Sequence, residues 1–277
     1  MKPERRRAWI VGVLAIFVSI VVFLVPFSFV ILQAAKSPAE ASSLAYSWPS
    51  KWQFSENLVT ALAANNGFLI RALINSAILT VCSVTLTVII SAMAGYVLAR
   101  KQSRLGPLVN FFVLAGLIVP PAVVPTIWVM QGLRLFGTMP GMILLEATFG
   151  LSFSILLFRN FVSTVPRELD EAAILDGASP ITLFTRIVIP LLRPVIVTVI
   201  VVQSVFVFND FALPLYFLPG AQNVTAQLAL YTFLGQNLSF YNLLFMAILI
   251  ITIPPLVGYI FFNRQIVGGL TSGAVKG

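Results

Sequence analysis

The feature that most constrains this chain is a set of long segments without a single charged residue. Residues 8–35, 72–99 and 105–133 contain no Asp, Glu, Lys or Arg. A helix of about 20 apolar residues is long enough to cross the hydrocarbon core of a bilayer. With 59% hydrophobic and only 9% charged residues in 277, the composition indicates a membrane protein and excludes a soluble or disordered chain.

Polar breaks divide the apolar sequence into spans, so we expect an all-α membrane protein with six transmembrane helices. The stretch at residues 194–265 is too long for one span, and a polar segment that begins at Pro219 and reaches Asn237 divides it. The predicted spans lie near residues 9–33, 72–98, 108–130, 141–158, 194–217 and 241–262.

The positive residues predict the orientation of these spans. We interpret residues 1–277 as one transmembrane domain, with a cytoplasmic loop at 159–193 and a cytoplasmic tail at 263–277. Positive residues accumulate in cytoplasmic loops, so both termini are expected in the cytoplasm. The first apolar segment is longer than a signal-peptide core of about 7–15 residues and is interpreted as a retained anchor. Of the 17 Lys and Arg residues, the exceptions on the outer side are Lys36, Lys51, Arg71 and Arg134.

The composition also excludes several classes of function. The chain has no His and one Cys, which excludes imidazole catalysis, His-ligated metal sites and disulfide frameworks. It contains no phosphate-binding loop of the type G-x-x-x-x-G-K-[ST], so the energy for any active process is expected to come from another chain. The net charge of +8 is attributed to the cytoplasmic loops and not to nucleic-acid binding.

Within the 159–193 loop, the residue order predicts two short helices separated by a tight turn. Pro166 suits the first turn of the first helix, and Gly177 suits a left-handed residue that ends it. Ser179 is expected to cap the second helix, which starts at Pro180 and is disrupted near Pro190. One face of the first helix could fit closely against a partner, although an ordinary surface loop shows the same pattern. This face contains Leu169, Ala172, Ala173 and Asp176.

The same loop carries a motif that begins at Glu171, ends at Pro190 and reads E-A-A-x3-G-x9-I-x-I-P. The motif resembles the EAA signature of binding-protein-dependent ABC importer permeases. Residues 94–100 and the ending at 269–277 are similar to the corresponding stretches of carbohydrate permeases of the maltose-transporter type.

The resemblance implies a type I ABC importer permease fold and a transport subunit, not an enzyme, in a prokaryotic plasma membrane. The implied solute is an oligosaccharide, a disaccharide, or a related polyol or glycerol phosphate, moved by alternating access. The implied partners are a second and usually different permease, two cytoplasmic ATPases that bind ATP and Mg, and an extracytoplasmic solute-binding protein. No cofactor is expected in this chain. The residues assigned to ATPase coupling are Glu171, Ala172, Ala173, Asp176 and Gly177, and capping of its own helix is the alternative for Glu171.

Polar residues inside the predicted spans are candidates for the translocation pathway. An ionisable side chain at the bilayer centre costs about 2.5–3.5 kcal/mol on insertion scales, so it usually faces a partner or water. Gln203 and Asp210 are seven residues apart and are expected on one helical face. Hydrogen bonds between helices, without solute contact, are the alternative. The pathway candidates are Asn75, Gln203, Asn209 and Asp210.

Two more expectations concern the spans themselves. Glu146 is expected near the outer end of the fourth span, within reach of water. Prolines are expected to bend or break the third span, and these are Pro120, Pro121 and Pro125.

An ion-coupled secondary transporter or channel subunit is the alternative function, because its hydropathy would be the same. Such a protein would carry mid-membrane carboxylates, and Asp210 is nearly the only candidate for one. A polytopic membrane enzyme is a weaker alternative, since the chain lacks most catalytic groups.

Overall fold

The computed structural model describes residues 3–101, 104–220, 222–236 and 240–272, and every regular element within these ranges is a helix. Four helices are long and apolar enough to cross a membrane, or up to six if each of two bent pairs counts as one span. The chain divides into two compact units, each described here by itself. Unit 1 comprises residues 1–71 and 228–254, and unit 2 comprises residues 72–227 and 255–277.

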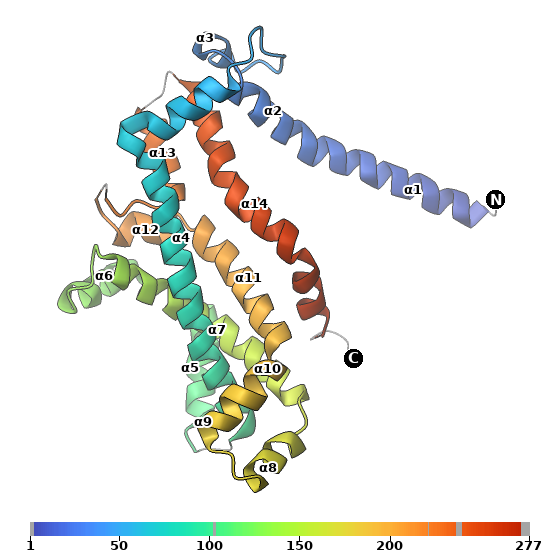
Figure 1. Ribbon diagram of the computed structural model, residues 1–277, viewed down its shortest axis with the longest axis vertical. Helices are drawn as coiled ribbons and strands as arrows, with labels where there is room; N and C mark the ends of the chain where they lie inside the picture. The colour runs from blue at the N-terminus through green and yellow to red at the C-terminus, as the bar shows by residue number, and fades with distance from the viewer. Residues whose placement is uncertain (1–2, 102–103, 221, 237–239, 273–277) are drawn as a thin grey trace. The chain divides into compact units, whose positions relative to one another are not determined.

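Unit 1 begins with a helical rod that corresponds to the first predicted span (Figure 1). The rod consists of α1 (Pro3–Ser19), the π-helix η1 (Ile20–Leu24) and α2 (Val25–Ala34). A short helix, α3 (Pro38–Ala41), follows it. Unit 1 also contains the first part of α4 (Phe54–Arg100), most of α13 (Ala226–Gln236) and the first part of α14 (Tyr241–Ser272).

A buried asparagine links these segments of unit 1. Asn57 donates from Nδ2 to the carbonyl oxygens of Ala34 and Lys36, both at 2.9 Å. Its Oδ1 accepts a hydrogen bond from Nδ2 of Asn242, also at 2.9 Å. The amide therefore satisfies the last carbonyl groups of the first span, which would otherwise be buried without a partner.

Helix α4 is interrupted before the second predicted span. Asn65, Asn66 and Gly67 take positive φ angles of 48°, 58° and 73°. Glycine and asparagine are the residues that enter the left-handed region with least strain. The sequence at this point therefore ends a short helical segment and starts the long helix that covers the predicted span at 72–98.

The core of unit 2 is formed by α4, α7 (Met139–Thr164) and α11 (Arg193–Asn209). Ala92, Phe158 and Val199 pack together in it, one from each helix. α4 and α7 approach closely at Gly95, where an added Cβ would lie 2.6 Å from Cβ of Phe158 and 2.9 Å from the backbone nitrogen of Arg159. Only a residue without a side chain fits this crossing.

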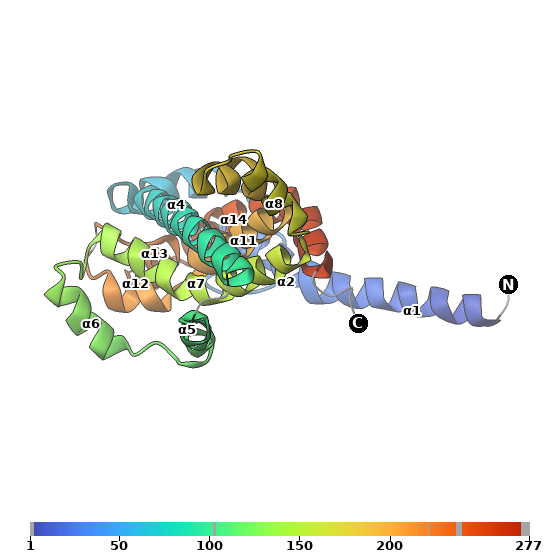
Figure 2. The same ribbon diagram turned by 90° about the horizontal axis from the view of Figure 1, so that it is seen from below.

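The third predicted span, at 108–130, is not one helix. The chain forms α5 (Gly106–Ile118) and α6 (Val123–Gly132), which meet at an angle of 120°. Figure 2 shows α5 almost end-on and α6 running across the view. The bend lies at Pro120 and Pro121, as predicted, because proline supplies no N–H to continue a helix and excludes the helical conformation from the residue before it.

The fifth predicted span, at 194–217, is also divided. α11 ends at Asn209 because Asp210 takes an extended conformation with ψ of 127°, and α12 (Ala212–Phe217) follows as a separate helix. α14 continues as a helix through Ser272, into the predicted cytoplasmic tail at 263–277. Residues 273–277 lie outside the described residues.

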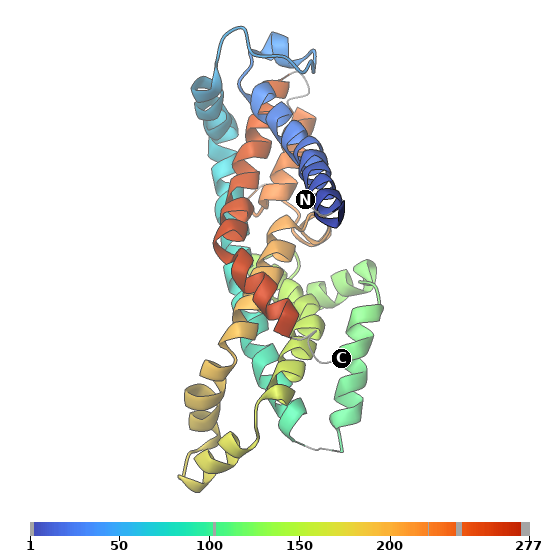
Figure 3. The ribbon, with the colours of Figure 1, turned by 90° about the vertical axis from the view of Figure 1, so that its right-hand side faces the viewer.

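The loop between α7 and α11 lies at one end of unit 2, beyond the ends of α4 and α7 (Figures 1 and 3). It contains α8 (Glu168–Leu175), α9 (Pro180–Thr182), the π-helix η2 (Leu183–Val188) and α10 (Ile189–Leu191). The segment from Pro180 to Leu191 meets α11 at an angle of 74°. The π-helix η2 ends two residues before Pro190, which has no N–H to donate to the helix.

Candidate functional site

The helix predicted in the loop between α7 and α11 is present as α8. Its first turn contains three acidic side chains, Glu168, Asp170 and Glu171, which interact favourably with the positive end of the helix dipole. Pro166 was predicted inside the first turn but precedes the N-cap residue, Arg167. The helix instead starts with backbone hydrogen bonds from Asp170 and Glu171 to the carbonyl oxygen of Arg167, at 2.9 and 3.1 Å.

The end of α8 is a Schellman motif centred on Gly177, as the sequence indicates. Gly177 has φ of +80° and donates its N–H to the carbonyl oxygen of Ile174 at 3.0 Å. Ala178 donates to the carbonyl oxygen of Ala173, also at 3.0 Å. This pair of bonds requires a left-handed residue between helix and turn. Apart from its two chain neighbours, no atom of the described residues lies within 4 Å of an added Cβ at Gly177, so the backbone conformation is what opposes substitution.

The second helix of the loop begins as predicted. The hydroxyl oxygen of Ser179 accepts the N–H of Thr182 at 3.2 Å, and Pro180 occupies the first turn of α9. Ser179 is therefore the N-cap residue, and the turn between α8 and α9 is held at both ends by local hydrogen bonds.

The predicted small-residue face of α8 is only partly exposed. Ala173, with 6% of its surface exposed, packs in the core of unit 2 and is not available to a partner. Glu171, Ala172, Asp176 and Gly177 are exposed. Within the described residues no hydrogen bond or ion pair involves the carboxylate of Glu171, and α8 has no side-chain cap. The structure thus gives no support to the alternative that Glu171 caps its own helix.

Large apolar side chains on the outer surface of this loop were missed by sequence reasoning. Leu175 is 88% exposed, Ile181 is 76% exposed and Ile174 is 60% exposed. We call these three residues the apolar loop surface. No role follows for them from the sequence alone, and only the fold shows that they lie outside the core of unit 2.

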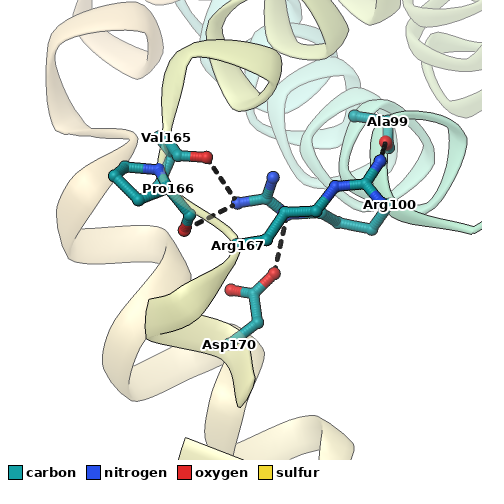
Figure 4. Close-up of polar contacts among 6 residues, drawn as sticks. All are labelled: Ala99, Arg100, Val165, Pro166, Arg167 and Asp170. Atoms are coloured by element: carbon teal, nitrogen blue, oxygen red, sulfur yellow. Dashed lines mark hydrogen bonds and ion pairs between the residues drawn. The ribbon is translucent and has the colours of Figure 1, made fainter. Parts of the chain in front are cut away.

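A further contact missed by sequence reasoning attaches α8 to the end of α4 (Figure 4). Nε of Arg100 lies 2.6 Å from Oδ2 of Asp170, and each side chain is only 12% exposed. Nη2 of Arg100 donates to the carbonyl oxygens of Val165 and Pro166 at 3.0 and 3.4 Å. Arg167 donates in return to the carbonyl oxygen of Ala99 at 3.4 Å. The C-terminal ends of α4 and α7 are thereby tied to the start of α8.

The two arginines lie where the ends of α4 and α7 favour a positive charge. The last carbonyl groups of a helix lack intrahelical partners and attract cations. Arg100 supplies a cation to the end of α7, and Arg167 supplies one to the end of α4. No spacing rule connects Arg100 to Asp170, because they are 70 positions apart. The sequence feature that could have indicated this pair is the negative charge of an Asp in a short helix that follows a Pro-Arg dipeptide.

A cavity of about 910 Å³ lies in unit 2, lined by residues of α7, α11 and α12 and by Pro121. Three of the four predicted pathway residues line it: Gln203, Asn209 and Asp210. The reason given for grouping Gln203 with Asp210 was wrong, because α11 ends before Asp210 and the two do not share a continuous helical face. The break at the end of α11 turns Asp210 into the cavity instead.

The fourth candidate, Asn75, does not line the cavity. Its Nδ2 donates to the carbonyl oxygens of Gln222 and Val224 at 2.9 and 3.0 Å. The neighbouring Ser76 accepts the N–H of Ala226 at 2.8 Å. These contacts hold the chain between α12 and α13 against α4, and they correspond to the alternative of internal hydrogen bonding.

Glu146 was expected to reach water and does not. It lies in α7, is only 7% exposed and lines the cavity together with Asp210. Its Oε1 is buried without a hydrogen-bond partner in the part of the chain that the structure describes. Oδ1 of Asp210 accepts the N–H groups of Ala212 and Leu213 at 2.8 and 3.3 Å, so it also caps α12.

The amide side chains of the cavity are engaged with the protein. Nε2 of Gln203 donates to the carbonyl oxygen of Gly150 and to Oγ of Ser154, at 3.2 and 3.1 Å. Nδ2 of Asn209 donates to the carbonyl oxygen of Val205 at 2.9 Å, and its Oδ1 accepts from Nε2 of Gln227 at 3.1 Å. The described lining is mostly apolar with a few polar side chains, and these form no catalytic constellation.

Comparison with known sequences identifies a matching family and related proteins. Residues 88–268 match the family described as "Binding-protein-dependent transport system inner membrane component". The chain is 32% identical to the diacetylchitobiose uptake system permease protein NgcG of Streptomyces coelicolor, over 99% of this chain and 90% of that protein. It is 30% identical to the melibiose/raffinose/stachyose import permease protein MelC of Bacillus subtilis, over 100% of both chains.

Two solved structures have a similar fold. One is a bacterial ABC transporter involved in the import of the acidic polysaccharide alginate, with a TM-score of 0.83, 19% identity and coverage of 95% of this chain and 98% of that chain. The other is a bacterial alginate ABC transporter in complex with an alginate pentasaccharide-bound periplasmic protein, with a TM-score of 0.60, 14% identity and 95% coverage of both chains. At these identities the likeness establishes the fold.

Proposed function

From the premise that the chain belongs to the family of binding-protein-dependent transport system inner membrane components, we propose that it is a carbohydrate permease of an ATP-driven importer. Family membership confirms the resemblance predicted from the EAA motif. It also means that the chain is a transport subunit and not an enzyme, and it disfavours an ion-coupled secondary transporter or channel.

The observation that carries the proposal is the exposed loop helix α8, which an ion pair attaches to α4. The apolar loop surface, Ile174, Leu175 and Ile181, presents hydrophobic groups outside the core of unit 2. Such a surface is suited to a groove on a partner. We infer that the partner is a cytoplasmic ATPase, which binds ATP and Mg, and that Glu171, Ala172, Asp176 and Gly177 contribute to the same contact. The loop and both termini then face the cytoplasm.

In this proposal, movement of α8 reaches the membrane through backbone and ion-pair contacts. Arg100 and Arg167 join α8 to the ends of α4 and α7. A displacement of α8 by a closing ATPase therefore moves these helices as well. Ala173, packed in the core, acts as a positioning residue within the coupling motif. If the solute pathway then opens at the two ends of the assembly in turn, the solute moves by alternating access.

The proposed solute is a carbohydrate, because the relatives are named for diacetylchitobiose and for melibiose, raffinose and stachyose. The cavity between α7 and α11 is its proposed path, with Gln203, Asn209 and Asp210 in the lining. The proposed assembly contains a second permease, two ATPases and an extracytoplasmic binding protein. The complex of a related fold with a solute-loaded periplasmic protein supports the last of these partners.

The proposal is tested by purifying the tagged chain from its native membrane and identifying its partners. We expect an ATPase and a second permease to co-purify, and ATP-dependent uptake of a saccharide in reconstituted vesicles when the binding protein is supplied. A Walker-lysine variant of the ATPase is the matched control and should abolish uptake. Saccharide uptake by the chain alone, driven by an ion gradient, would overturn the proposal.

A further inference from the structure

We propose that the cavity between α7 and α11 discriminates against anionic solutes, so that the importer carries uncharged saccharides and rejects uronate oligomers and phosphorylated polyols. This inference rests on the proposed function and narrows its substrate class. It concerns the charge of the cavity, which can be measured without knowing the solute.

The lining of the cavity is acidic. Among the described residues that line it, the ionisable ones are Glu146 and Asp210, and none is basic. The two carboxyl groups are hydrogen-bonded to each other, so they share a proton and carry one negative charge between them. The ion pair that the structure describes joins Arg100 to Asp170 in the loop, and no such pair involves either cavity carboxyl. A low-dielectric cavity lined by one sign of charge concentrates ions of the opposite sign and excludes ions of its own sign.

The protein leaves part of the hydrogen-bonding capacity of the lining unused. Both side-chain N–H groups of Gln203 donate, to Gly150 and Ser154, whereas one of the two N–H groups of Asn209 donates to Val205. Oε1 of Glu146 is more than nine-tenths buried and has no partner within the described residues. The free capacity of the described lining therefore includes the acceptor Oε1 of Glu146 and one N–H of Asn209, which suits a sugar hydroxyl group because a hydroxyl both donates and accepts.

The rest of the lining is mostly apolar. Phe149, Phe153 and Phe206 line the same cavity, together with aliphatic side chains. A pyranose ring offers both an apolar face and a rim of hydroxyl donors. Aromatic walls with few well-placed polar groups are the usual composition of a site for such an amphipathic ligand. Within the described lining, a carboxylate or phosphate group on the solute would meet the negative charge of the Glu146–Asp210 pair and no basic side chain.

The experiment measures the electrostatic potential of the cavity in the assembled transporter. Cys82, which is exposed, is first replaced by Ser, and Val205→Cys then places a reporter thiol on the exposed part of the lining. The thiol is labelled with a cationic trimethylammonium methanethiosulfonate and, separately, with its anionic sulfonate counterpart. The ratio of the two rate constants is compared among variants with the same reporter, so the intrinsic reactivities of the reagents cancel.

We expect Glu146→Gln and Asp210→Asn together to lower the cation-to-anion ratio by about tenfold or more at low ionic strength. Asparagine can still cap α12, and glutamine has the shape of glutamate, so both variants preserve the fold. Glu56→Gln is the matched control because it removes an exposed carboxylate outside the cavity, and it should leave the ratio unchanged.

Two outcomes would overturn the proposal. One is a ratio that does not respond to the cavity variants, and the other is a reporter thiol that neither reagent reaches. Both leave the proposed function intact if the ATPase still co-purifies and saccharide uptake persists. Conversely, a chain that purifies without an ATPase would contradict the proposed function whatever the labelling ratio.

Discussion

Nε of Arg100 lies 2.6 Å from Oδ2 of Asp170, and this ion pair joins the last residue of α4 to the first turn of α8. Both side chains are 12% exposed, so water screens the pair only weakly. The same arginine donates to two carbonyl oxygens at the end of α7. One side chain thus connects two long helices of unit 2 with the loop helix proposed to bind the ATPase.

Removal of this connection should uncouple ATP hydrolysis from transport. Arg100→Ala leaves Asp170 and two carbonyl groups without their partner, and loss of one member of a largely buried ion pair destabilises by about 3 kcal/mol. We expect uptake to fall at least tenfold while the ATPase still co-purifies and hydrolyses ATP. Lys101→Ala is the control, since Lys101 is the adjacent exposed cation. Normal uptake by Arg100→Ala would show that the ion pair transmits no movement.

Gly177 provides a graded test of the turn after α8. Its φ of +80° strains an alanine by about 1–2 kcal/mol, whereas asparagine tolerates the left-handed region better. Uptake should therefore decrease in the order glycine, asparagine, alanine, with membrane insertion unaffected. Gly132→Ala is a suitable control because Gly132 has ordinary helical φ and free space around it. If Gly177→Asn and Gly177→Ala were equally active, the turn geometry would not matter for coupling.

Substitutions in the apolar loop surface should impair assembly with the ATPase and leave the folding of the chain unaffected. Leu175 is 88% exposed in the isolated chain, so Leu175→Ala should leave its thermal stability within about 0.5 kcal/mol of the parent. Burial of a leucine in a partner groove contributes about 1.5–3 kcal/mol, which corresponds to a loss of ATPase affinity of roughly 10- to 100-fold. Titration of the purified ATPase onto the permease measures this loss. Val59→Ala, at a residue that is 66% exposed in the first part of α4, should bind the ATPase normally.

Gly95 tests the crossing of α4 and α7. A methyl group there would lie 2.6 Å from Cβ of Phe158 and 2.9 Å from a backbone nitrogen, so the two helices must separate. Gly95→Ala should destabilise the chain by about 1–3 kcal/mol, seen as a lower midpoint of thermal unfolding in detergent. Gly258→Ala, at a glycine with nothing within 4 Å of an added Cβ, should be neutral. An unchanged midpoint for Gly95→Ala would contradict the observed helix packing.

Several local features could be predicted because neighbouring residues determine them. Gly177 and Ser179 define the end of α8 and the start of α9 through bonds to residues at most five positions away. The prolines at 120 and 121 predicted the break between α5 and α6 for the same reason, although not its angle of 120°. Asp210 shows the limit of this reasoning, since an intramembrane polar residue was identified correctly but was placed on a helix that ends one residue earlier.

By itself, the sequence determined the class of environment, the number of apolar segments, the local caps of the loop and, through the EAA motif, the family. These follow from hydropathy and short-range hydrogen bonding, which depend on residues close together in the chain. Only the tertiary structure decided that Arg100 pairs with Asp170, that Ala173 faces inward while Leu175 faces outward, and that Glu146 shares a cavity with Asp210. Such contacts join residues up to 70 positions apart, and their geometry depends on how whole helices pack and bend.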